Sequence, residues 1–133
     1  MGLTALALLV GRILYGGYFV MSGWNHFAHR GMLADYAKSK NVPMPKVAVI
    51  VSGILLLAGG LGILLGAYIR WAVLAIAVFL VVVTFAMHAY WKDTDPNAKM
   101  GNQVNFMKNL ALLGAACMLL SIPISSWAVY ALF

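Results

Sequence analysis

Charged residues are scarce in this chain. Asp, Glu, Lys and Arg make up 9% of the 133 residues, whereas hydrophobic residues make up 64%. An ordinary soluble domain has about 25% charged residues, because its surface must face water. Together with the mean hydropathy of +0.93, this scarcity excludes an ordinary water-soluble domain. Lipid is therefore the expected solvent for much of the surface.

Cysteine is nearly absent as well. The single cysteine, Cys117, excludes an intramolecular disulfide and a dithiol relay within this chain, and its apolar surroundings predict a structural role. The opening residues Met1-Gly2-Leu3-Thr4 lack a basic n-region, and the apolar run after them continues to residue 27. We therefore expect this run to be kept as a transmembrane helix and not cleaved as a signal peptide.

Acidic residues number only three, against nine Lys and Arg, which gives a formal net charge of +6. Such a balance is common among nucleic-acid-binding proteins. Here, however, the basic residues are scattered through loops and helix ends and do not cluster on one polar face. We therefore expect the bilayer, and no nucleic acid, to be the partner of this chain.

Four apolar segments are long enough to cross a bilayer core, which takes about 20 helical residues. They cover residues 3–27, 47–67, 71–91 and 104–122. The predicted fold is an all-α integral membrane protein, a four-transmembrane-helix bundle that forms one domain over residues 1–133. Residues 123–133 are too short to span again, and we expect Trp127 and Tyr130 to anchor this tail in the membrane interface.

The loop over residues 29–46 has apolar side chains at helical spacing, which predicts a short helix lying on the membrane surface. These side chains are Met32, Leu33, Tyr36 and Ala37. Pro43 and Pro45 are expected to end this segment. This loop and the loop over residues 92–101 hold most of the basic residues, so the positive-inside rule predicts that both are cytoplasmic and that both termini lie outside.

Polar residues within the spans are costly in a bilayer unless they are paired or hydrated, so they mark candidate sites. In the first span they fall on one helical face with Arg12, Tyr15, Phe19, Ser22, Gly23 and His26. Similar faces hold Thr84, His88 and Trp91 in the third span and Asn105, Lys108, Asn109 and Leu112 in the fourth.

Antiparallel neighbours bring the end of the first span, the end of the third and the start of the fourth to one depth. The sequence therefore predicts a ligand-binding pocket in the cytoplasmic half of the membrane. Its predicted polar residues are His26, His88, Asn105, Lys108 and Asn109, and its predicted aromatic wall is Trp24, Tyr90 and Trp91, with Phe106 beside them.

These residues also have ordinary structural interpretations. Lys108 can extend to water and pair with Asp93 or Asp95. The histidines can bond to backbone carbonyls, and the asparagines can join helices to one another. Arg12 lies in the opposite half of the membrane, out of reach of all three acids. Its partner is then lipid phosphate, a backbone carbonyl, the terminal carboxylate, a ligand or another subunit.

Glycine is frequent in the first two spans, where lipid supplies no hydrophobic drive for helix association and small residues let backbones approach. We expect helix contacts at many of these positions, which are Gly11, Gly16, Gly17, Gly23, Gly53, Gly59, Gly60, Gly62 and Gly66.

Several runs of residues resemble the DoxX family. They are Gly11-Arg12, Ser22-Gly23-Trp24-Asn25-His26, Val42-Pro43-Met44-Pro45, Gly59-Gly60-Leu61-Gly62, His88-Ala89-Tyr90-Trp91 and Asn105-Phe106-Met107-Lys108-Asn109. Two positions depart from the pattern of many members. His26 stands where they have lysine, and Leu56 stands where they have glutamate.

The resemblance implies a small four-helix protein of the bacterial inner membrane. The family is named from a subunit associated with thiosulfate:quinone oxidoreductase, and other members accompany redox complexes. A redox-linked subunit that binds a quinone-like or anionic ligand is the first hypothesis. One alternative is a non-catalytic assembly, anchoring or transport-like subunit. Another is a haem-binding bundle with His26 and His88 as axial ligands. A redox complex or a second copy of the chain is a possible protein partner. The residues indicate no metal cluster.

Overall fold

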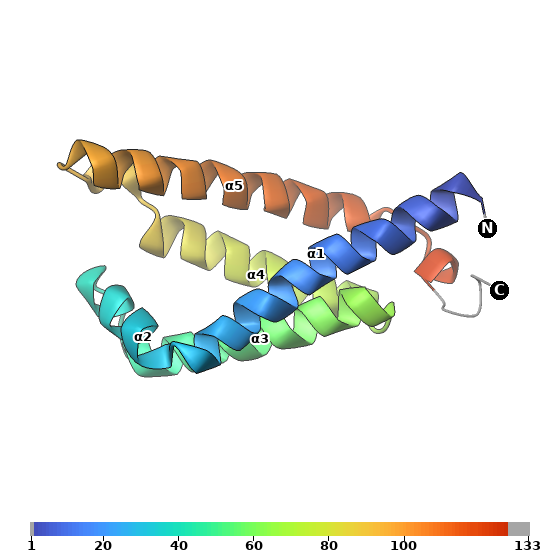
Figure 1. Ribbon diagram of the computed structural model, residues 1–133, viewed down its shortest axis with the longest axis horizontal. Coiled ribbons are helices and arrows are strands. Elements are labelled where there is room, and N and C mark those ends of the chain that lie inside the picture. The colour runs from blue at the N-terminus through green and yellow to red at the C-terminus, as the bar shows by residue number, and fades with distance from the viewer. Residues whose placement is uncertain (1, 128–133) are drawn as a thin grey trace.

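The computed structural model describes residues 2–127, which form only helices and the turns between them (Figure 1). Four long helices and one short one follow in the order α1 (Leu3–Ala28), α2 (Arg30–Ser39), α3 (Pro45–Leu65), α4 (Ile69–Met87) and α5 (Pro96–Leu120). Two single 3₁₀ turns, η1 (Tyr90–Lys92) and η2 (Ile124–Trp127), follow α4 and α5.

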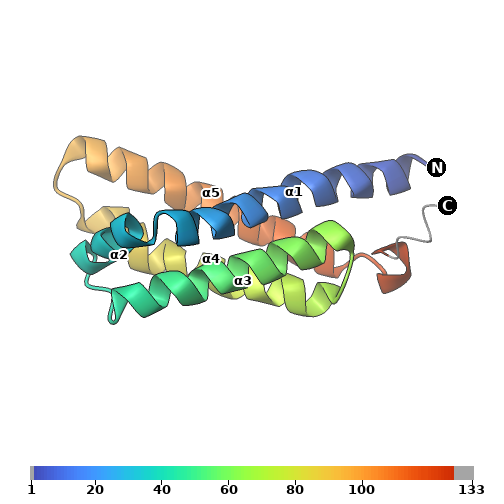
Figure 2. The same ribbon diagram turned by 60° about the horizontal axis from the view of Figure 1, so that its bottom comes forward.

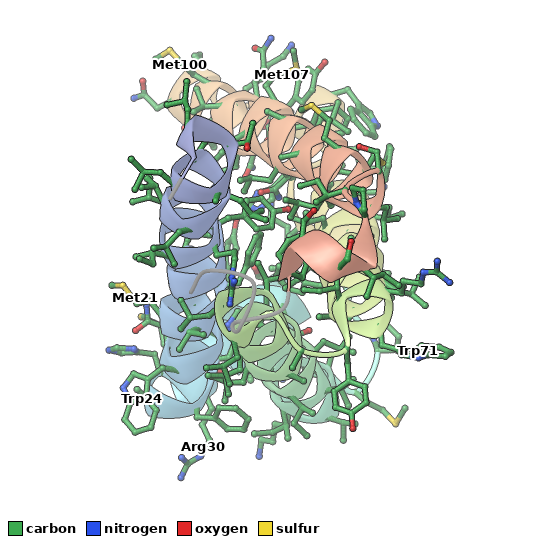
Figure 3. All side chains as sticks on the ribbon, turned by 90° about the vertical axis from the view of Figure 1, so that its right-hand side faces the viewer. Met21, Trp24, Arg30, Trp71, Met100 and Met107 are labelled. Carbon is green, nitrogen blue, oxygen red and sulfur yellow. The ribbon has the colours of Figure 1, made fainter. Side chains whose placement is uncertain are left out.

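Each long helix is apolar enough to cross a membrane, with η1 extending the third span to Lys92. Only 11–33% of the residues in the most apolar stretch of each span are buried inside the protein. The remaining apolar side chains, such as Met21, Trp24 and Trp71, point away from the bundle (Figure 3). Lipid must cover them, because water would not tolerate so large an apolar surface. The predicted all-α membrane fold is confirmed.

The chain reverses direction at each connection, so the described ends lie together. The N-terminus, the α3–α4 turn and η2 are at one end, and α2 and the α4–α5 connection are at the other (Figure 2). The α3–α4 turn is tight because Gly66 (φ 72°) and Tyr68 (φ 50°) both adopt the left-handed conformation. The even number of spans accounts for this shared end.

The short helix expected in the first loop is present as α2. It packs mainly against α3, and it buries Ala34 and Ala37 across the end of the bundle. It ends at Ser39, before the two prolines, and Pro45 occupies the first turn of α3, where a missing N–H costs nothing. The face of α2 with Ala34 and Ala37 thus closes the end of the bundle that lies opposite the described ends of the chain.

The fourth span begins at Pro96, in a segment where the sequence predicted a loop up to residue 101. The Asp95 carboxylate accepts a hydrogen bond from the Ala98 amide at 2.9 Å, and Pro96 follows it in the first turn. This is a strong N-terminal cap. It adds two turns to α5 outside its apolar stretch, and these turns bring Asn102 into the structure of the site.

Glycines make the contact between α1 and α3. A Cβ added to Gly16 would lie 2.9 Å from the Gly60 carbonyl, and one added to Gly23 would lie 2.9 Å from the Leu57 amide. Gly11 and Gly17 face open space. The expected role of glycine is therefore confirmed at some positions of α1 and not at others. The close approach fixes the register of α1 against α3, and hence the position of His26 along the bundle axis.

Candidate ligand-binding cavity

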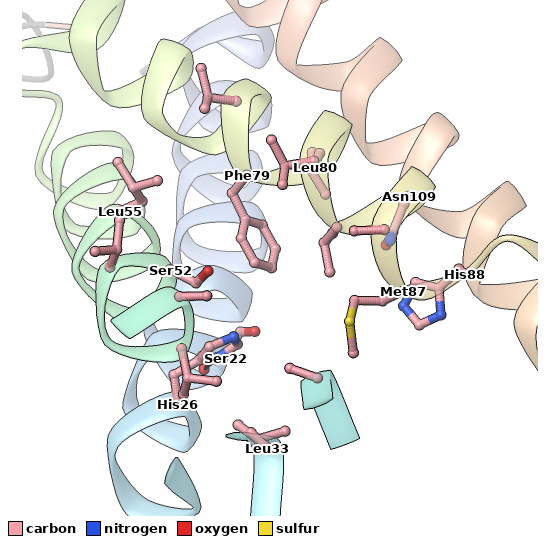
Figure 4. A pocket seen from close by; sticks show the side chains of 18 of the residues that line it. Ser22, His26, Leu33, Ser52, Leu55, Phe79, Leu80, Met87, His88 and Asn109 are labelled. Atoms are coloured by element: carbon pink, nitrogen blue, oxygen red, sulfur yellow. Dashed lines mark hydrogen bonds between the residues drawn. The ribbon is translucent and has the colours of Figure 1, made fainter. Parts of the chain in front are cut away.

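A cavity of about 540 Å³ lies toward the α2 end of the bundle, among α1, α2, α3, α4 and α5 (Figure 4). Its walls are mostly apolar, with side chains such as Leu55, Phe79 and Met87. A few polar groups interrupt this surface. Small-molecule sites in proteins have this size and this mixture of many apolar walls with few polar groups.

Four residues that the sequence placed in one pocket line this cavity, namely His26, His88, Lys108 and Asn109. The predicted pocket residues Asn105, Trp24, Tyr90 and Trp91 are not part of the lining. Convergence of α1, α4 and α5 at one depth therefore occurs as expected. That these residues bind a ligand stays a prediction.

His26 is held by its own helix and by α4. Its Nδ1 lies 2.8 Å from the Ser22 carbonyl oxygen, one turn earlier in α1. The Phe79 ring of α4 contacts the imidazole edge to face, with centroids 5.8 Å apart. Gly53 of α3 allows this approach, because a Cβ there would lie 3.1 Å from the His26 Cβ. Three helices thus position one imidazole at the cavity wall.

His88 follows the last residue of α4 and begins a chain of polar contacts. Its Nδ1 lies 3.1 Å from Asn102 Oδ1, and Asn102 Nδ2 donates to Asp93 Oδ2 at 2.8 Å. Asp93 Oδ1 is in turn 3.6 Å from Lys40 Nζ, which follows α2. This chain, from His88 through Asn102 and Asp93 to Lys40, ties the cavity wall to the short helix that closes the bundle.

Asn109 is only 6% exposed, yet it faces the cavity (Figure 4). Its side-chain amide forms no hydrogen bond with any of residues 2–127, and its oxygen and nitrogen are not among the fully buried unpartnered atoms of these residues. The amide therefore stays accessible from the cavity, where a bound molecule or water can form hydrogen bonds with it.

Lys108 lies at the exposed rim of the cavity. Its ammonium contacts Asn105 Oδ1 at 3.4 Å, a long and weak contact. Asp93 and Asp95, the partners suggested for Lys108 from the sequence, are engaged elsewhere: Asp93 with Asn102 and Lys40, and Asp95 as the cap of α5. The suggested Lys108 ion pair is therefore wrong for the described chain.

The predicted aromatic residues lie outside the cavity. Trp24 is exposed on the lipid-facing side of α1 (Figure 3). Tyr90, Trp91, Phe85 and Phe106 contact one another edge to face or at a tilt, with centroids 5.4–6.5 Å apart, between α4, η1 and α5. This cluster fixes the turn that presents His88 and is not a wall of the cavity.

Asn102 and the cavity residues of α2 were not predicted from the sequence. Asn102, Asn105 and Asn109 fall at i, i+3 and i+7, which is one helical face. The signal was therefore present, but a helix expected to start at residue 104 excluded its first member. The α2 residues Leu33 and Ala37 line the cavity because α2 folds back over it, which the spacing within α2 does not reveal.

Arg12 occupies the other half of the bundle and is 4% exposed. Its Nη2 and Nε lie 3.0 Å and 3.3 Å from the Leu64 carbonyl oxygen near the end of α3. Its Nη1 lies 3.4 Å from the Trp127 carbonyl. Of the alternatives open from the sequence, backbone carbonyls are the partners found. Trp127 is 1% exposed, so its predicted role as a lipid-facing anchor is wrong, and Tyr130 lies outside the described residues.

A second hollow lies between α1 and α5, at the end of the bundle where the chain begins. It measures about 810 Å³ and is lined by small and apolar residues, including Ala7, Gly11 and Ala115. Tyr15 lines this hollow, and its hydroxyl donates to the Leu112 carbonyl at 2.7 Å, while Leu112 lines the first cavity. The bond therefore marks the boundary between the two spaces. In residues 2–127, no three His, Cys, Asp or Glu side chains gather as a metal site.

Comparison with known proteins supports the resemblance. The DoxX family model matches residues 7–89, a range that contains both cavity histidines and ends before α5. The chain is 27% identical over 112 residues to the inner membrane protein YphA of Escherichia coli K12, with 84% of this chain and 79% of that protein covered. No solved structure matches the chain significantly. The chain is a multi-pass inner membrane protein and belongs to the DoxX family.

Proposed function

We propose that the cavity binds a lipid-soluble, quinone-like molecule and that the protein acts as the binding subunit of a membrane redox system. The observation that supports this most is Asn109, a largely buried residue whose amide lines the cavity without a hydrogen-bond partner in the described chain. A ring with oxygen substituents satisfies such an amide, and its flat faces suit the apolar walls.

Access from the bilayer is consistent with a lipid-soluble ligand. Val51 of α3 and Val78 and Val82 of α4 line the cavity and are also exposed on the outside of the bundle. The space therefore reaches the lipid-facing surface between these two helices. A molecule dissolved in the hydrocarbon can enter there without crossing water.

The polar groups come from different helices around the cavity. His26 belongs to α1, His88 follows α4, and Asn109 belongs to α5. A benzoquinone ring has its two oxygens at opposite ends, so separated hydrogen-bonding groups are suited to it. An anionic ligand would instead depend on Lys108 at the rim, because Lys40 is already paired with Asp93.

A redox role requires a partner protein. With one cysteine the chain has no dithiol of its own, so electrons must be delivered or removed by another component of the membrane. The protein would hold and orient the ligand for that component. A non-catalytic assembly or anchoring subunit and a haem-binding bundle are the competing functions, and both are outcomes of the test below.

Lipid-soluble molecules that co-purify with the protein from native membranes can be extracted and identified by mass spectrometry. We expect a quinone-like compound near one equivalent in wild type and at least about a tenfold loss in Asn109→Leu, because a buried hydrogen bond and its specificity are removed. Asn97→Leu, on an exposed turn of the same helix, should keep the compound. Full retention in Asn109→Leu would contradict the proposal and favour the assembly function.

Two further readouts separate the alternatives. Lys108→Met removes the ammonium and its three donors. It should abolish binding of an anion but only weaken binding of a neutral ring. Haem bands in the visible absorption spectrum of protein purified without added cofactor would show that the ligand is haem and not a quinone-like molecule.

A further inference from the structure

The polar chain behind His88 fixes which of its ring nitrogens holds the proton. Asp93 is a carboxylate and only accepts hydrogen bonds, so Asn102 must turn its NH₂ group toward Asp93, as the 2.8 Å contact shows. Asn102 therefore presents its oxygen to His88, 3.1 Å from Nδ1. An amide oxygen only accepts, so Nδ1 must be the protonated nitrogen of His88.

His26 is fixed in the same way by a different acceptor. Its Nδ1 lies 2.8 Å from the Ser22 carbonyl oxygen, which cannot donate. Nδ1 must therefore hold the proton of this ring as well. The Phe79 ring packs edge to face against the imidazole, so rotation of the ring to exchange its nitrogens is hindered.

Both neutral imidazoles consequently have an unprotonated Nε2, which accepts a hydrogen bond and cannot donate one. Neither Nε2 forms a hydrogen bond with any of residues 2–127. Both rings line the cavity, His26 from α1 and His88 from the end of α4 (Figure 4). The cavity thus has two acceptors. Asn102 and Asp93, which are not part of the lining, hold His88 in this state, and the Ser22 carbonyl holds His26.

We propose that the cavity selects the reduced, hydroquinone form of its ligand over the quinone form. This inference rests on the proposed function. Each hydroxyl of a hydroquinone donates to an Nε2 lone pair, whereas each carbonyl of a quinone places its own lone pairs against them. The Asn109 amide can both donate and accept, so it serves either form. Asp93 and Asn102 are positioning residues for this selection, because they act through the protonation of His88.

Lys40 is the last member of this chain of polar contacts. Its ammonium lies 3.6 Å from the second oxygen of Asp93, while Asn102 donates to the first oxygen. An ionised Asp93 cannot donate to Asn102, so the direction of every hydrogen bond up to His88 is set. The end of α2 therefore influences which form of the ligand is bound.

The binding test uses the full chain in nanodiscs with a decyl-substituted benzoquinone and its hydroquinone, the latter kept reduced under argon. In wild type the hydroquinone should bind about tenfold more tightly or better, since two hydrogen bonds depend on the form. In Asp93→Asn the neighbouring amide can donate or accept, so Asn102 can turn over and the ratio should fall to the level that His26 alone supports. Asn102→Leu should lower the ratio as well.

Asp95→Asn is the matched control. It removes a carboxylate from the same connection, but asparagine also caps a helix well, and Asp95 is not part of the chain to His88. Its ratio of affinities should equal that of wild type. Equal binding of both forms to wild type would overturn the inference and leave the proposed function standing. Absence of binding by either form would overturn both.

Nitrogen-15 spectra of histidine-labelled protein provide a second readout that does not depend on ligand affinity. The protonated and unprotonated ring nitrogens have well-separated resonances, and His29→Gln removes the third histidine from the spectrum. We expect His26 and His88 to show a protonated Nδ1 and an unprotonated Nε2. In Asp93→Asn the His88 signals should change while those of His26 stay. A protonated Nε2 on neutral His88 in wild type would overturn the inference.

Discussion

The guanidinium group of Arg12 is satisfied by backbone carbonyls, although the residue lies deep in a membrane helix. The last carbonyls of a helix lack partners within it and have a partial negative charge. Leu64 is next to the last residue of α3, so a cation there both completes a hydrogen bond and complements the helix dipole. The same guanidinium reaches η2 through the Trp127 carbonyl. One side chain thus joins α1, α3 and the segment after α5.

Replacing Arg12 with methionine should lower the free energy of unfolding in detergent by about 2–3 kcal/mol, because hydrogen bonds to a buried charge are lost. Arg70→Met removes an exposed arginine at the start of α4 and should change stability by less than about 0.5 kcal/mol. Ligand retention should be unaffected in both variants, since neither residue lines the cavity. Equal stability of the two variants would show that Arg12 is not a structural link.

Single residues were predicted from the sequence with uneven success, and the reasons are physical. His26, His88, Lys108 and Asn109 were brought to one cavity because helix periodicity and antiparallel packing determine which faces meet. The partner of Arg12 could not be chosen, because a backbone carbonyl has no sequence signature. Trp127 was expected in lipid because tryptophan favours interfaces, but the fold of η2 turns it into the core.

At the scale of elements, the seam between α1 and α3 depends on glycine at some positions and not at others. Gly16 and Gly17 are neighbours in the chain with opposite surroundings. A Cβ on Gly16 would meet the Leu64 amide at 2.8 Å, while a Cβ on Gly17 meets nothing within 4 Å. Backbone atoms cannot rotate away, so only separation of the helices relieves the first contact.

Gly16→Ala should therefore lower the free energy of unfolding by about 1–3 kcal/mol, as overpacking does elsewhere. Gly17→Ala should stay within about 1 kcal/mol of wild type, since alanine only improves helix propensity there. Denaturation followed by circular dichroism in detergent measures both. Equal effects of the two substitutions would contradict the packing of α1 on α3.

Element boundaries show where sequence reasoning ends. The apolar core of each span was identified because about 20 apolar residues suffice to recognise a membrane helix. The polar start of α5 was not identified, because hydropathy does not distinguish a polar helical turn from a loop outside the bilayer. In addition, Asp95-Pro96 was not interpreted as a helix cap. The contacts of α2 with the cavity depend on the turn at His29, where the chain leaves α1 after a single residue. No pattern within α2 predicts that angle.

At the scale of the whole molecule, the two ends of the bundle differ in charge. The α2 end has most of the basic residues, whereas the half with the α3–α4 turn has only Arg70 and the buried Arg12 within the described chain. The positive-inside rule then predicts a cytoplasmic α2 end and outer termini. Ser39 and Ser126 lie at the two ends and are both exposed, so each can accept a cysteine probe.

In a Cys117→Ser background, a membrane-impermeant thiol reagent applied to intact cells should label Ser126→Cys and not Ser39→Cys. Opening the cells should expose position 39, which serves as the control for reactivity. Labelling of position 39 in intact cells would reverse the orientation and place the cavity in the outer half of the membrane.

A quinone-like molecule in the cavity at the α2 end of the bundle can be detected by photolabelling with an azido-substituted benzoquinone in native membranes, followed by peptide mapping. We expect adducts on cavity residues of α4 and α5, such as Met87 and Leu112, and competition by an excess of unmodified ligand. Asn109→Leu should lower the yield about tenfold. Adducts confined to lipid-facing residues such as Met21 or Trp71, with no effect of competitor, would contradict binding of such a molecule in the cavity.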